Sequence, residues 1–183
     1  MGRTVHKWTA SSEQTWEGTP SVDVEHTVEA EIGALLQQHR LTLALAESAT
    51  GGLVAARIVN VAGSSAYFKG GVVAYDNLVK ESVLGVRGET LAPDGAVSEA
   101  TAREMAEGVR KLMGADIGAS DTGIAGPTGA TPTKPVGLFY LGLATPDGAR
   151  VQEYFFSGNR TEIRQQAAQR VLAMLRDYLR GLP

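Results

Sequence analysis

Residues 41–52 read Leu-Thr-Leu-Ala-Leu-Ala-Glu-Ser-Ala-Thr-Gly-Gly, and this stretch decides the fold. Its first half, Leu41 to Ala46, is mostly apolar and contains no Gly or Pro, which predicts a strand. A helical pattern follows over residues 53–61, so the segment Glu47–Gly52 must turn the chain from strand to helix. A strand–turn–helix unit of this kind is typical of α/β folds, whose ligands bind at the carboxyl ends of the strands.

Elements on either side of this stretch complete an α/β pattern. Predicted helices begin at Val24, cover 53–61 and 77–84, and begin after Ser98 and Asn159; predicted strands cover 70–75, 115–122, 138–145 and 150–156. Helices separate the early strands, so those strands should pair in parallel, whereas Pro146-Asp-Gly148 indicates an antiparallel hairpin. We therefore predict a single three-layer α/β/α domain with a mixed sheet over residues 23–183, preceded by a flexible or docking tail, residues 1–22.

The composition excludes several kinds of chemistry. The chain of 183 residues contains no cysteine, and its three histidines all lie within the first 40 residues, at positions 6, 26 and 39. Thiolate catalysis, a Ser-His-Asp arrangement and a Cys or His metal site are therefore not expected in the body of the chain. The net charge of −3 argues against a broad basic surface for nucleic acid, and no apolar run is long enough to cross a membrane. We expect a cytoplasmic protein without a metal or cofactor.

The first candidate site is the turn at Glu47–Gly52. Ser48 would lie at the carboxyl end of the sheet, with the amides of Ala49, Thr50 and Gly51 free to bind an oxyanion or a phosphate. The alternative is a plain Ser/Thr helix cap. The turn has neither the Gly-Lys-Ser/Thr ending of a phosphate-binding P-loop nor the Gly-x-Ser-x-Gly pattern of a nucleophile elbow.

The second candidate site is Tyr75 with Lys80, where a strand passes into a short helix. A hydroxyl nucleophile needs a proton acceptor, and a lysine can serve only if burial or another cation lowers its pKa. Flanking valines would supply an apolar wall. The alternative is a solvated lysine on an amphipathic helix.

Two further segments contain candidate ligand-binding groups. Thr122 ends a strand and precedes a loop rich in Gly and Pro, residues 123–137, which includes Gly123, Gly126 and Lys134. Backbone amides of such a loop can approach a ligand closely, although the loop can equally be structural. Arg160 and Arg164 lie in the first turn of the last helix, where the helix dipole does not favour cations. A phosphate ligand would account for them, and ordinary surface arginines are the alternative.

Together these segments resemble the CinA C-terminal domain family, which includes bacterial nicotinamide-nucleotide amidohydrolases. The resemblance covers about residues 25–180, through motifs at family spacing: 46–52, 63–68, 71–80, 95–99, 122–127, 134–137 and 157–160. It implies hydrolysis of nicotinamide mononucleotide to nicotinic acid mononucleotide and ammonia, by a serine/lysine mechanism without metal. It also implies a homodimer or higher homo-oligomer, with neither nucleic acid nor a membrane as a direct partner.

The resemblance also implies roles for individual residues. Ser48 is similar to the family's nucleophile and Lys80 to its base, while Tyr75, Thr122 and Arg160 resemble assisting or substrate-binding groups. Arg160, with Arg164 or Lys134, would hold the substrate phosphate, and residues 123–129 would border its ribose or ring. Departures from the family pattern include Ala49 in place of Cys, and Asp121, Thr128 and Ala130. They leave open a nucleotide-binding or regulatory module without turnover, or an amidase for another small amide.

Overall fold

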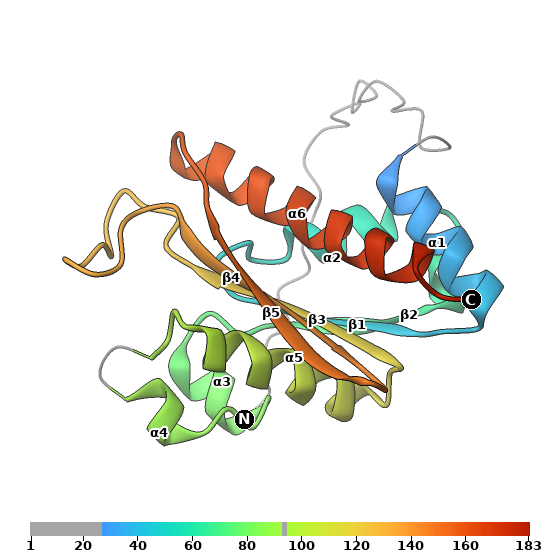
Figure 1. Cartoon of the computed structure of the whole chain (residues 1–183), viewed down its shortest axis with the longest axis horizontal. Helices are drawn as coiled ribbons and strands as arrows, with labels where there is room; N and C mark the ends of the chain where they lie inside the picture. Colours follow the sequence, from blue (N-terminus) through green and yellow to red (C-terminus); the bar gives the residue numbers. More distant parts are fainter. Residues whose placement is uncertain (1–26, 93–94) are drawn as a thin grey trace, which may run out of the picture.

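The computed structural model describes residues 27–92 and 95–183, and it has a five-stranded sheet between two layers of helices (Figure 1). The strands are β1 Leu43–Glu47, β2 Phe68–Val73, β3 Ile117–Gly123, β4 Leu138–Thr145 and β5 Gly148–Phe155. The helices are α1 Val28–His39, α2 Leu53–Val59, α3 Asn77–Ser82, α4 Gly88–Leu91, α5 Glu99–Met113 and α6 Arg160–Arg180, with a 3₁₀ turn at Ser64–Ala66. The predicted three-layer α/β/α architecture is confirmed.

The sheet has the strand order β2-β1-β3-β4-β5. β1 pairs in parallel with β2 and β3, and the β4–β5 hairpin is antiparallel, as the sequence predicts. The four-residue α4 and the 3₁₀ turn were not predicted, and β2 ends at Val73 rather than at Tyr75. Tyr75 therefore lies in the loop between β2 and α3. Because β2, β1 and β3 are parallel, their carboxyl ends meet at one edge of the sheet.

The core divides into two clusters, one on each face of the sheet. Leu43 and Leu45 of β1 belong to the larger cluster, under α1, α2 and α6, whereas Ala44 and Ala46 belong to the smaller one, with α5 (Figure 1). This is the period-two alternation of a strand that is buried on both faces. Small residues on the second face let α5 pack closely: a Cβ at Gly118 would lie 2.2 Å from the Ala106 carbonyl oxygen.

Two predicted features lie outside the residues that the structure describes. They are the tail, residues 1–22, and the start of the first helix at Val24. Within residues 27–92 and 95–183, the helices are all too short or too polar to span a bilayer.

Candidate functional site

A cavity of about 190 Å³ opens where the carboxyl ends of β2, β1 and β3 meet. It brings together seven of the residues that the sequence singled out: Ser48, Ala49, Tyr75, Lys80, Thr122, Gly123 and Arg160. Four more lining residues were not named individually: Asn77, Ala96, Val97 and Ala125. Three larger hollows, of about 590, 780 and 470 Å³, are lined by neither Ser48 nor Lys80. We therefore place the candidate site in the smaller cavity, where the reactive groups converge.

The Ser48 turn is held from below by the Glu47 carboxylate. This side chain accepts hydrogen bonds from the backbone N–H groups of Gly52 at 2.8 Å, Val54 at 3.1 Å and Ala55 at 2.8 Å. It therefore supplies acceptors for N–H groups at the start of α2 that have no partner within the helix. Gly52 has a φ of 92°, which L side chains rarely adopt, so the tight passage from strand to helix needs a glycine there. Ser48 is 8% exposed, at the wall of the cavity.

Asp121 provides a second support beneath the same turn. Its carboxyl group accepts hydrogen bonds from the Ser48 amide at 3.2 Å and from the Thr50 amide at 3.0 Å, and it also contacts the Thr50 hydroxyl. Burial raises the pKa of Asp121 to about 6, against the opposing effect of the hydrogen bonds from Thr50. The Thr50 amide, which was predicted to bind an oxyanion, instead donates a hydrogen bond to Asp121. The Thr50 side chain is wholly buried. Of the other two residues whose amides were predicted to bind an oxyanion, Ala49 lines the cavity and Gly51 does not.

Lys80 is 98% buried. The alternative prediction, a solvated lysine on an amphipathic helix, is therefore wrong. The Lys80 ammonium nitrogen donates to the Tyr75 carbonyl oxygen at 3.2 Å. Burial lowers the pKa of Lys80, and the charges of Asp121 and Asp76 oppose that effect. In the described part of the chain, no hydrogen bond joins Lys80 Nζ to Ser48 Oγ, although both residues line the cavity.

Tyr75 and Arg160 close the outer side of the cavity. The Arg160 guanidinium donates to the Tyr75 hydroxyl at 3.0 Å and to the Gly126 carbonyl oxygen at 2.7 Å. Tyr75 is 63% exposed, so the pair lies between the cavity and solvent. Both recorded partners of Arg160 are uncharged, which leaves its positive charge available to an anionic ligand.

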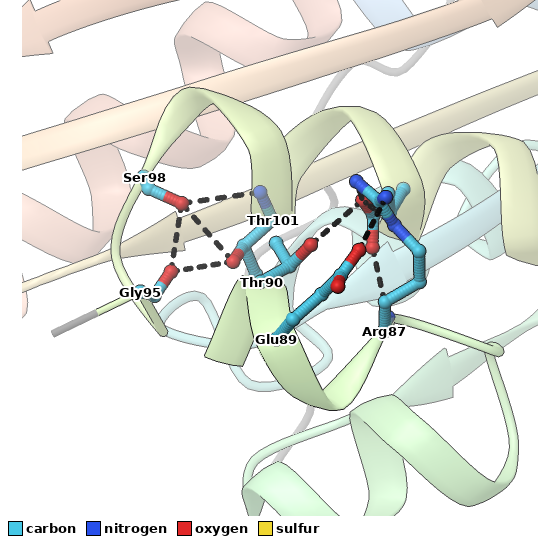
Figure 2. A network of polar contacts seen from close by, with 7 residues as sticks. Arg87, Glu89, Thr90, Gly95, Ser98 and Thr101 are labelled. Atoms are coloured by element: carbon cyan, nitrogen blue, oxygen red, sulfur yellow. Dashed lines mark hydrogen bonds and ion pairs between the residues drawn. The ribbon is translucent and has the colours of Figure 1, made fainter. Parts of the chain in front are cut away.

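A polar network positions the opposite wall, formed by Ala96 and Val97. Figure 2 shows Ser98 donating to the Gly95 carbonyl oxygen at 2.7 Å and accepting the Thr101 amide at 3.2 Å, which caps α5. Farther along, Arg87 and Thr90 donate to the Glu104 carboxylate and tie α4 to α5. From the sheet, Thr122 Oγ1 donates to the Ala96 carbonyl oxygen at 2.6 Å. Its hydroxyl thus anchors the wall of the cavity.

Five of the predicted site residues do not line the cavity: Thr50, Gly51, Gly126, Lys134 and Arg164. Arg164 reaches the turn from α6 and donates to the carbonyl oxygens of Ala49 at 3.1 Å and Thr50 at 2.5 Å. Lys134 lies in the 123–137 loop, where its backbone bridges to Thr131. In this structure Arg164 is therefore a support of the Ser48 turn.

Sequence reasoning assigned no role to Glu47 or Asp121, the two carboxyl groups beneath the turn. A usable signal existed for each of them. Glu47 follows an apolar strand directly and precedes Ser48, and Asp121 is an acidic residue inside a predicted strand of small and apolar residues. A charged group in such a position must be paired or hydrogen-bonded when it is buried.

The comparisons with known proteins agree on one family. The family described as "CinA C-terminal domain" matches residues 25–179. A CinA-like protein of Kosmotoga olearia is 52% identical over 155 residues, which cover 85% of this chain and 38% of that protein. The chain spans 38–39% of the length of the other curated relatives at 52% identity.

Solved structures give the same result for the fold. The competence/damage inducible protein CihA from Agrobacterium tumefaciens is 37% identical, with a TM-score of 0.82, and the match covers 90% of this chain and 99% of that one. A CinA superfamily protein from Klebsiella pneumoniae is 34% identical, with a TM-score of 0.81, and the match covers 85% and 97% of the two chains.

Proposed function

The chain belongs to the CinA C-terminal domain family, and from that membership we propose that it is an amidohydrolase acting on nicotinamide mononucleotide. The products would be nicotinic acid mononucleotide and ammonia. The observation that carries the proposal is the almost complete burial of Lys80 in the wall of the cavity that also contains Ser48. A buried lysine with a lowered pKa is an amine that can accept a proton, which a ligand-binding site alone would not need.

The first half of the proposed reaction forms an acyl-enzyme. Uncharged Lys80 accepts the Ser48 proton, directly or through Tyr75, and Ser48 Oγ attacks the carboxamide carbon. The Ala49 amide, at the wall of the cavity, binds the developing oxyanion, and one such donor is worth about 3 kcal/mol in the transition state. The C–N bond then breaks, and the leaving nitrogen takes the proton from Lys80 to depart as ammonia.

The second half regenerates Ser48. Lys80, uncharged again, accepts a proton from water, and the resulting hydroxide attacks the ester carbon. The bond between that carbon and Ser48 Oγ breaks, and the proton on Lys80 returns to Ser48. The net change is one water consumed and one amide converted to a carboxylic acid and ammonia.

The size of the cavity indicates how the substrate would enter. At about 190 Å³ it is smaller than the roughly 300–1,000 Å³ of pockets that enclose a whole drug-sized ligand. It would therefore admit the carboxamide end and leave the ribose phosphate at the mouth. Arg160 is placed there, and a guanidinium can bind a phosphate through two parallel hydrogen bonds. Arg164 and Lys134 do not line the cavity, so the proposed phosphate contact is made by Arg160.

Release of ammonia from nicotinamide mononucleotide tests the proposal. We expect release by the native chain, and its loss in Ser48→Ala and Lys80→Ala. The matched control is Lys69→Ala, which removes an exposed lysine from β2 and should leave the rate unchanged. Equal rates in all four proteins would overturn the Ser48 and Lys80 assignment.

A second candidate is a nucleotide-binding or regulatory module that has kept the cavity without turnover. The departures from the family pattern at Thr128 and Ala130, in the loop that also contains the cavity residue Ala125, favour it or an amidase for another small amide. Binding of nicotinamide mononucleotide by the native chain without release of ammonia would identify this module. Release of ammonia from a different small amide would identify an amidase of other specificity.

A further inference from the structure

A buried group of three side chains lies beneath the Ser48 turn, and the proposed mechanism does not use it. Ala46 of β1 pairs with Ser120 of β3, so the next residues in each strand, Glu47 and Asp121, lie side by side. Thr50 Oγ1 lies between their carboxyl groups, 2.7 Å from Glu47 Oε2 and 2.5 Å from Asp121 Oδ2. No more than 3% of any of the three residues is exposed.

The hydrogen count of this group requires a proton on one of the two carboxyls. A threonine hydroxyl has one hydrogen, so it can donate to only one of them. The second contact is a hydrogen bond only if the other carboxyl is protonated and donates to Thr50 Oγ1. Two ionised carboxylates this close together, with water excluded, would repel one another strongly.

The surrounding amides indicate that Asp121 has the proton. Glu47 accepts three backbone N–H groups from the start of α2, and these stabilise its negative charge. Asp121 accepts only two, one of them at 3.2 Å, and burial already raises its pKa to about 6. The Thr50 hydroxyl lowers the pKa of Asp121 only while the hydroxyl hydrogen points toward the Asp121 carboxyl group. With that hydrogen donated to Glu47, the hydroxyl accepts from Asp121 and raises its pKa further.

We propose that Asp121 is a positioning residue that keeps its proton in the folded protein, and that Lys80 thereby loses one of its two carboxylate counter-charges and stays in its uncharged form. Moving this proton from Asp121 to Lys80 would leave the total number of protons unchanged and would create two charges in a buried site. The effect on Lys80 rests on the proposed function, because a base is needed there only if Ser48 is a nucleophile.

Other charged groups at this end of the sheet act on the same equilibrium. Asp76, which caps α3, favours a charged Lys80, and burial opposes it. From α6, Arg164 binds the carbonyl oxygens of the turn, and Arg160 lies across the cavity. Protonation of Asp121 removes one of the two carboxylates that would otherwise stabilise a charged Lys80.

Nuclear magnetic resonance of the resting protein tests the first part of the proposal. In native protein labelled with ¹³C at the aspartate carboxyl carbons, we expect one resonance to keep the acid form up to neutral pH, and Asp121→Asn to remove that resonance. If every aspartate in the native protein ionises near the ordinary pKa of about 3.9, the proposal is overturned. This titration needs only the native protein, so it holds even if the variant does not fold.

The second part is tested on the ¹⁵Nζ resonance of Lys80, assigned with Lys80→Gln among the five lysines at positions 7, 69, 80, 111 and 134. Asparagine is isosteric with a protonated aspartate, so Asp121→Asn should leave the Lys80 titration midpoint unchanged. A midpoint that falls by about 1–3 pH units would show that Asp121 is an ionised counter-charge, and would refute the proposal. Neither measurement uses substrate, so failure to hydrolyse an amide would count against the proposed function alone.

Discussion

Replacing Asp121 by asparagine should change how the stability of the protein depends on pH. In the folded protein burial raises the pKa of Asp121 from 3.8 to about 6. The folded state therefore binds this proton more tightly than the unfolded state. Its stabilising contribution is fully present below pH 3.8 and is lost as the pH rises through the folded pKa. At about 1.36 kcal/mol for each pKa unit, the rise is worth about 3 kcal/mol.

Urea denaturation of native protein and Asp121→Asn, between about pH 3.5 and pH 8, measures this contribution. Asparagine does not titrate, so the free energy of unfolding of the native protein should fall by at least about 3 kcal/mol relative to the variant across this range. The pH at which the fall levels off reports the folded pKa, and levelling near or above neutrality agrees with the retained proton. Asp147→Asn, which changes an exposed turn residue, is the control and should follow the native curve. Parallel curves for native protein and Asp121→Asn would refute the reasoning.

Three further substitutions test the supports of the site by denaturation. Gly123→Ala would place a Cβ 2.3 Å from the Phe139 ring and should lower the free energy of unfolding by about 1–3 kcal/mol; an unchanged value would show that the ring can move aside. Ser98→Ala removes the cap of α5 and should cost about 1 kcal/mol, whereas Ser98→Thr should keep most of it; equal losses would argue against capping. Thr50→Val removes the hydroxyl between the two buried carboxyls and should cost about 1–3 kcal/mol, with Thr50→Ser restoring most of the loss; a neutral Thr50→Val would contradict the hydrogen-bonded arrangement.

Local sequence patterns were sufficient to predict most of the fold. The apolar strand before Ser48, the helix that begins after Asn159, and the Pro-Asp-Gly turn between β4 and β5 all depend on neighbouring residues, and the structure contains each of them. The short helix α4 was missed, because its four residues are too few to show a helical period. The placement of Ser48 and Thr122 in one cavity followed from the rule that parallel strands end at one edge of the sheet, whereas Lys80 and Arg160 reach it from helices α3 and α6.

The sequence by itself limited the available chemistry: with no cysteine, and no histidine after residue 39, thiolate and imidazole groups are excluded from the body of the chain. Only the tertiary structure decided that Lys80 is buried, that Arg164 binds the turn, and that Asp121 lies beneath Ser48. The physical reason is that a side chain's charge state depends on the burial and partners that surround it. Those partners come from elements far apart in the chain, as with the 73 residues that separate Ser48 from Asp121.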